Sequence, residues 1–139
     1  MKKILCGVCL WLLTFSSWAD IKIDNAYVPK MPPASMAYAA YLTLTNTGVE
    51  PRTLVSVISS DFDLAHLHRT VMKEGKSSMK GIHRLVIEAG ETVSFEPGGM
   101  HVMLMKPKEP IAKQGKIPLV LTFDDGEKIE IMAAVKFIE

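Results

Sequence analysis

The sequence has very little cysteine: only Cys6 and Cys9, both within the first nine residues. If that part of the chain is a removable leader, the rest contains no thiol. This absence excludes a blue-copper electron carrier, which needs a thiolate ligand. It also excludes thiol–disulfide exchange and structural zinc sites made of cysteine. An exported chain without disulfides has to be stabilised by a packed core, and about 120 residues can form one.

A long hydrophobic run is lacking as well. Residues 4–15 are apolar, but this stretch is shorter than the roughly 20 residues of a membrane span. Lys2 and Lys3 precede it, and Ser17 and Ala19 form a small-x-small cleavage signal around Trp18. This order is typical of a secretory signal peptide. We expect a leader over residues 1–19, cleavage after Ala19, one domain over residues 20–139, export to the periplasm and no membrane span after cleavage.

Neither sign of charge is in excess: the sequence has 16 Lys and Arg, 15 Asp and Glu, and a net charge of +1 at pH 7. Removing the two lysines of the leader makes the net charge −1. This balance gives no indication of nucleic acid or an anionic membrane as a partner. The sequence also contains no P-loop, nucleophile elbow or acidic cluster, so no motif indicates an enzyme.

Short extended runs separated by turn residues predict a single all-β domain, a β-sandwich. No amphipathic helix of useful length, internal repeat or second domain is recognisable. Residues 61–63 are expected to form a loop, and Asp124, Asp125 and Gly126 a hairpin turn. The expected strands are residues 21–28, 39–45, 54–58, 65–71, 78–85, 92–95, 101–105, 119–123 and 128–135.

Metal-binding side chains are concentrated in residues 66–105. This segment contains all four histidines and five of the nine methionines. Imidazole nitrogen and thioether sulfur together suit a soft, low-valent metal, above all Cu(I). The relevant residues are His66, His68, Met72, Met79, His83, Met100, His101, Met103 and Met105.

Strand geometry predicts which of these donors share a face. Residues two apart point the same way, so His101 and Met103 lie on one face of their strand, and His66 and His68 on one face of theirs. A four-residue loop over residues 72–75 would place Val71 opposite Lys76 and His68 opposite Met79. A slip of one residue would turn Met79 to the other face.

The remaining donors have a simpler interpretation. Methionines on strands usually fill the core, and we expect this of Met72, Met100 and Met132. His83 is expected on the surface. The roles of His66 and Met105 stay open: His66 could support His68 or simply face solvent, and Met105 is on the right face but one residue pair further along, where it could belong to the core.

The spacing of His68, Met79, His101 and Met103, His-x10-Met-x21-His-x-Met, resembles the signature of the PCuAC-type periplasmic copper chaperones. The surrounding sequence is similar too, over nearly the whole of residues 20–139. The segments that carry the likeness are residues 39–48 (AAYLTLTNTG), 97–105 (PGGMHVMLM) and 119–126 (LVLTFDDG).

The resemblance implies a cupredoxin-like Greek-key β-sandwich that binds one Cu(I) ion through these four side chains. It implies a non-enzymatic carrier that delivers copper to the CuA centre of cytochrome c oxidase subunit II, or to another periplasmic copper chaperone. Two features depart from the family pattern. Arg69 follows His68, where an acidic residue or Met is common, and no His- and Met-rich tail follows residue 137, so no second, Cu(II) site is expected.

Other functions compete with this interpretation. The domain could be a general periplasmic copper buffer, or a secreted interaction module whose Met-rich edge binds a peptide. A metalloenzyme could use His66, His68 and His101 as a three-histidine zinc site, but no Glu is placed as an obvious general base. A copper oxygenase with an N-terminal His ligand does not fit a mature chain that starts at Asp20.

Overall fold

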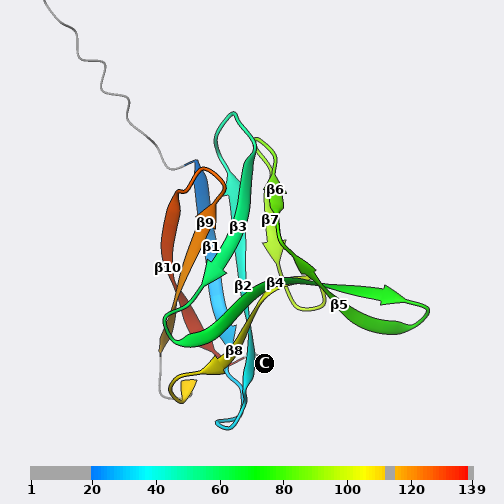
Figure 1. Ribbon diagram of the computed structural model, residues 1–139, viewed down its shortest axis with the longest axis vertical. Helices are drawn as coiled ribbons and strands as arrows, with labels where there is room; N and C mark the ends of the chain where they lie inside the picture. Colours follow the sequence, from blue (N-terminus) through cyan, green and yellow to red (C-terminus); the bar gives the residue numbers. More distant parts are fainter. Residues whose placement is uncertain (1–19, 112–114, 138–139) are drawn as a thin grey trace, which may run out of the picture.

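The computed structural model describes residues 20–111 and 115–137, and within these it contains ten β-strands (Figure 1). The strands are β1 (Ile21–Pro29), β2 (Ala37–Asn46), β3 (Arg52–Ile58), β4 (Phe62–Lys73), β5 (Lys76–Ile82), β6 (Leu85–Ile87), β7 (Thr92–Phe95), β8 (Met100–Pro107), β9 (Lys116–Phe123) and β10 (Lys128–Lys136). The expected signal peptide and its cleavage site lie outside the described residues. In the described ranges, no helix is long and apolar enough to cross a membrane.

Hydrogen bonds join the strands into one mixed sheet, in the order β5-β4-β8-β7-β2-β1-β10-β9-β3-β6. Most neighbours are antiparallel, whereas β1 with β10 and β7 with β8 are parallel. The β4–β5 hairpin extends away from the rest of the molecule (Figure 1). Since β5 ends the sheet order, β5 has only β4 beside it, whereas β4 also pairs with β8.

The core is formed by the inward-facing residues of the strands; in β2 and β9 fully buried residues alternate with partly exposed ones. Leu42 and Leu44 of β2, Val102 of β8 and Leu119 and Leu121 of β9 are all essentially inaccessible to solvent. They belong to one hydrophobic cluster, so the sheet bends round to cover a single interior. This confirms the predicted single all-β domain.

Two strand predictions were wrong. Residues 61–63 were expected to form a loop, but β4 begins at Phe62, whose ring is buried and packs edge-on against Tyr38 at 5.7 Å between centroids. The expected strand over residues 78–85 divides at His83 and Arg84 into β5 and β6. β5 pairs with β4 and β6 pairs with β3, so the chain changes neighbour at this point.

The turn of the β4–β5 hairpin was also predicted wrongly. It has two residues instead of four, because Lys73 pairs with Lys76 and only Glu74 and Gly75 lie between them. Both turn residues have positive φ, 52° and 75°. Two central residues with positive φ make a type I′ turn, whose twist matches that of the flanking strands.

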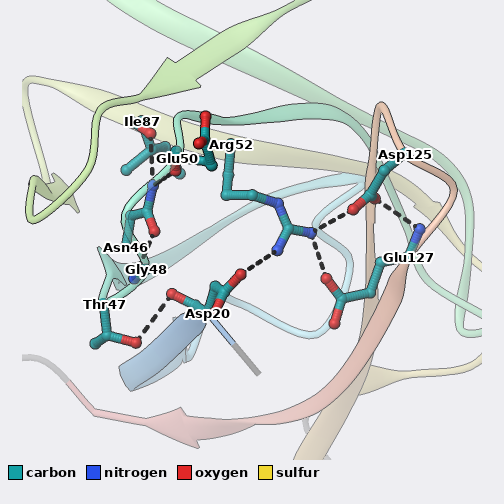
Figure 2. A network of polar contacts seen from close by, with 9 residues as sticks. All are labelled: Asp20, Asn46, Thr47, Gly48, Glu50, Arg52, Ile87, Asp125 and Glu127. Carbon is teal, nitrogen blue, oxygen red and sulfur yellow. Dashed lines mark hydrogen bonds and ion pairs between the residues drawn. The ribbon is translucent and has the colours of Figure 1, made fainter. Parts of the chain in front are cut away.

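A group of ion pairs surrounds Arg52 at the start of β3 (Figure 2). The Arg52 guanidinium lies 3.0 Å from Asp125, 3.6 Å from Asp20 and in contact with Glu127. Its side chain is only 11% exposed and packs over the Phe123 ring. Burial alone would lower the pKa of Arg52, but the three carboxylates outweigh it and raise that pKa. The pairs tie the β9–β10 turn to the amino-terminal end of β1.

Asn46, at the end of β2, lies beside this group and is fully buried (Figure 2). Its side-chain amide donates hydrogen bonds to the carbonyl oxygens of Glu50 and Ile87, at 2.8 and 3.0 Å. Its side-chain oxygen accepts a bond from the Gly48 amide at 3.0 Å. Every polar atom of this buried side chain therefore has a partner.

Candidate metal centre

The β4–β8 ladder brings three histidines and a methionine together. His68 pairs directly with His101, and His66 pairs directly with Met103. Directly opposed residues of antiparallel strands project to the same face, with Cβ atoms about 4.5–5.5 Å apart. Two segments separated by more than thirty residues thus place their donors side by side.

These side chains point away from the core. The alternating residues Leu67, Val102 and Leu104 are buried in the hydrophobic cluster, so the donors lie on the other face of the sheet, where His66 is exposed, His68 and Met103 are partly exposed and His101 is buried. We call this surface of β4, β5 and β8 the donor face. It carries His66, His68, Met79, His101 and Met103.

Two imidazoles at the centre of the donor face have buried nitrogen atoms without a hydrogen-bond partner. The atoms are His68 Nδ1 and His101 Nε2, and His101 is only 5% exposed. A buried polar atom without a partner costs about 1–3 kcal/mol, so such atoms are rare outside functional sites. The two ring centroids lie 5.8 Å apart. Since a metal bound to an imidazole nitrogen lies about 3 Å from the ring centroid, one ion could bind both rings.

The environment of His68 disfavours its protonation. Burial of the ring, followed by repulsion from His101 and His66, lowers the pKa of His68 from its ordinary value. Only a neutral imidazole can bind a metal ion. Proton competition at His68 is therefore weaker than at an exposed histidine.

Met79 is on the predicted face but not at the predicted position. It pairs with Thr70, and Gly81 is the residue opposite His68. The two-residue turn shifts the register by two from the prediction, and a shift of two keeps every side chain on its face. Met79 is therefore a diagonal neighbour of His68, within reach of a long side chain, and is 57% exposed on the projecting hairpin.

The other donors are distributed as follows. Met100 packs against the core as expected, whereas Met72 and Met132 are more than half exposed, so their predicted core positions were wrong. Met72 lies near the tip of the hairpin, where no second layer covers it. His83 is exposed, as expected. Met105 lies on the same face as Met103, further along β8 between Leu64 and Ala37.

His66 and Arg69 take positions that the sequence left unclear. His66 is exposed, and its ring is parallel to that of His68 with centroids 6.2 Å apart. Arg69 pairs with Met100 on the face opposite to the donors, and its guanidinium donates to the Met100 sulfur at 3.3 Å. The positive charge of Arg69 therefore does not point at the donor face.

The geometry favours a mixed set of donors. Within residues 20–111 and 115–137, no three His, Cys, Asp or Glu side chains are close enough together to hold a metal ion. A three-histidine zinc site is therefore not formed. Any ion bound between His68 and His101 would need thioether sulfur, which Met103 offers from the neighbouring position on β8.

Residues 21–135 match the model of the family described as "Putative lipoprotein LpqE-like". The chain belongs to the LpqE-like family. It is 36% identical to the protein Lxx21020 of Leifsonia xyli subsp. xyli over 117 residues, which are 84% of this chain and 69% of that one. It is 30% identical to the uncharacterized protein RP573 of Rickettsia prowazekii over 89 residues, 63% of this chain and about half (49%) of that protein.

Solved structures share the fold. The copper-bound PCuAC domain from PmoF2 matches with a TM-score of 0.71 and 21% identity, over 86% of this chain and 94% of that domain. The solution structure of apo-DR1885 from Deinococcus radiodurans gives a TM-score of 0.68 and 27% identity, over 99% and 93% of the two chains. Its CuI form gives 0.65 and 33%, over 81% and 75%. The protein therefore has a PCuAC-like β fold.

Proposed function

We propose that this protein binds one Cu(I) ion through His68, Met79, His101 and Met103 and transfers it by ligand exchange, without catalysis. The observation that carries the proposal is the pair of buried imidazole nitrogens on the donor face, His68 Nδ1 and His101 Nε2, which have no hydrogen-bond partner. Two neutral imidazoles and two thioethers match the preference of Cu(I) for soft donors. The PCuAC-like fold and the copper-bound states of two similar structures support it.

The choice of ligands suits transfer better than storage. Imidazole and thioether ligands are neutral, so the bound ion keeps its charge of +1 and no thiolate holds it. His101 and Met103 lie on a central strand of the sheet, whereas Met79 lies on the projecting hairpin. We infer that His68, His101 and Met103 form the fixed part of the site and that Met79 is the ligand replaced first.

The destination of the copper is a finer proposal. We infer a periplasmic location, which the leader-like sequence over residues 1–19 and the lipoprotein description of the family support. The acceptor proposed is the CuA centre of cytochrome c oxidase subunit II, or another periplasmic copper chaperone. Incubating the Cu(I)-loaded protein with the soluble, thiol-reduced apo-CuA domain, followed by oxidation of the re-isolated domain with ferricyanide, would produce the visible absorption of mixed-valence CuA if transfer occurs, whereas a general copper buffer would leave the domain empty.

An anaerobic Cu(I) competition titration tests the binding itself. The parent protein is expected to bind one equivalent tightly, and His68→Ala and Met103→Ala to bind it much more weakly. The matched controls are His83→Ala and Met132→Ala, which remove an exposed imidazole and an exposed thioether outside the donor face. Equal losses in the controls would mean that copper binds to surface donors without a defined site.

A further inference from the structure

A small pocket lies beside the donor face, where β5 ends next to β4. Its volume is about 150 Å³, and its lining includes His66 and His68 of β4, Gly81 and His83 at the end of β5, and Ser56 of β3. A water molecule occupies about 30 Å³ in the liquid, so the pocket has room for roughly five waters or for one side chain. The pocket therefore gives an outside group access to the flank of His68.

Gly81 is the residue that leaves this flank open. It pairs directly with His68, so a side chain at position 81 would project onto the donor face beside that imidazole. Gly81 does not have a positive φ, and a Cβ atom placed on it would meet no atom within 4 Å. Neither the backbone nor packing requires glycine here. Glycine inside a strand is unfavourable by about 0.5–1 kcal/mol relative to Ala and often marks a place where another group approaches closely.

We propose that this pocket is the entry for the partner's donor side chain, a thioether or imidazole that reaches the copper ion next to His68. The inference rests on the proposed copper function and deepens it. The incoming sulfur or nitrogen forms a bond to Cu(I), and the bond to the exposed Met79 sulfur breaks. The ion stays Cu(I) and no proton has to move when the incoming group is a thioether. A partner that fits is a protein presenting an exposed Met or His side chain small enough for the pocket.

Filling the pocket tests the proposal. Gly81→Leu places a bulky side chain beside His68 without changing any donor, and Gly81→Ala gives a smaller obstruction. Gly115→Leu is the matched control: Gly115 also lacks a positive φ, also has free space around its Cβ position, and precedes β9, which is no neighbour of β4 or β8 in the sheet. The measurement is the rate at which N-acetylmethionine amide, a thioether small enough for the pocket, releases copper from each loaded protein. Excess bicinchoninate, too bulky for the pocket, traps the released Cu(I) as its coloured complex, and the increase over bicinchoninate alone is followed by anaerobic stopped-flow absorbance.

For the parent we expect a rate that rises in proportion to the thioether concentration at fixed bicinchoninate, because the thioether enters before Met79 leaves. Gly81→Leu should be slower by about tenfold or more, Gly81→Ala intermediate, and Gly115→Leu unchanged. The copper Kd should stay within about threefold in all of them, since an obstructed entry slows loading and unloading alike.

The experiment distinguishes a failure of the proposed copper function from a failure of the entry proposal. A parent protein that binds no stoichiometric copper contradicts the proposed function before any rate is measured. If the parent binds copper, equal rates for Gly81→Leu and the parent overturn the entry proposal. An affinity loss of more than about tenfold in Gly81→Leu also overturns it, because position 81 would then be shaping the ligand geometry itself.

Discussion

The two ends of this sheet treat buried polar groups in opposite ways. Around Arg52, a mostly buried guanidinium is surrounded by three carboxylates, and both polar atoms of the neighbouring Asn46 side chain have hydrogen-bond partners. On the donor face, His68 Nδ1 and His101 Nε2 are buried without any partner. The first arrangement stabilises the fold, since each polar atom exchanges water for a protein partner. The second leaves donor atoms ready for an ion.

The difference suggests that stability and metal binding are separable in this protein. Removing a group at the Arg52 end should lower the free energy of unfolding and leave copper binding unchanged. Removing a donor should do the reverse. The predictions below test this separation, beginning with the largest expected effect.

His101→Leu should weaken Cu(I) binding by more than about 100-fold, because loss of a ligand costs more than the 10–100-fold typical of residues that only support one. The same change replaces a buried nitrogen without a partner by an apolar group of similar size. We therefore expect the free energy of unfolding of the apo protein to stay the same or rise by up to about 1 kcal/mol. Competition titration and urea unfolding measure the two quantities. A variant that is clearly less stable than the parent would mean that His101 has a structural role.

Arg52→Met should lower the free energy of unfolding by about 2 kcal/mol. The estimate is below that for a fully buried pair because Asp20, Asp125 and Glu127 remain partly exposed. Methionine keeps the aliphatic contact with Phe123 but leaves the carboxylates facing one another. Copper affinity should not change. The control is Arg84→Met, which removes an exposed pair with Asp124 and should cost less than about 0.5 kcal/mol.

Met103→Leu and Met79→Leu compare the fixed and the projecting thioether. Met103 is half-buried and lies directly opposite His66, whereas Met79 is exposed and only diagonal to His68. We expect about tenfold weaker Cu(I) binding for Met79→Leu and a clearly larger loss for Met103→Leu. A larger loss at Met79 would contradict the assignment of Met79 as the ligand replaced first.

The pH dependence of stability gives the smallest effect. The pKa of His68 is lowered in the folded protein, so between the folded and unfolded values the unfolded chain binds more protons and stability rises with pH. The apo protein should therefore lose stability as the pH falls below about 6.5, and the loss should level off once the folded pKa is passed. His68→Leu should remove this part of the dependence. Urea unfolding at pH 7.5 and 5 compares the two proteins, and identical pH profiles would argue against a shifted His68.

Much of the donor face could be predicted from the alternation of residues along single strands. His101 and Met103 share a face, and their neighbours Val102 and Leu104 are buried, because the period of a strand is two. The likeness to PCuAC domains supplied the long-range combination of four donors. What could not be predicted was how β4 and β5 align, since this depends on whether the turn has two residues or four. The structure has the two-residue turn, in which Glu74 has a positive φ. This alignment pairs Gly81, not Met79, with His68.

Which side chains are buried was harder to predict than the face of the strand on which they lie. Met72 and Met132 are hydrophobic residues of a type common in cores, but their side chains are more than half exposed. His101 is polar, yet it is buried on the donor face, where β4 lies beside it and the His68 ring packs edge-on against its own. The sequence around Arg52 likewise gave no sign of the ion pairs, because Asp20, Asp125 and Glu127 come from distant parts of the chain and meet only in the folded sheet.

The most direct test of the central claim is X-ray absorption at the copper edge of the anaerobic Cu(I)-loaded protein, compared with His101→Leu. The account predicts nitrogen neighbours at about 2.0 Å and sulfur neighbours at about 2.3 Å around one ion, with the nitrogen contribution reduced in the variant. A spectrum with nitrogen or oxygen alone, or one that His101→Leu leaves unchanged, would contradict it.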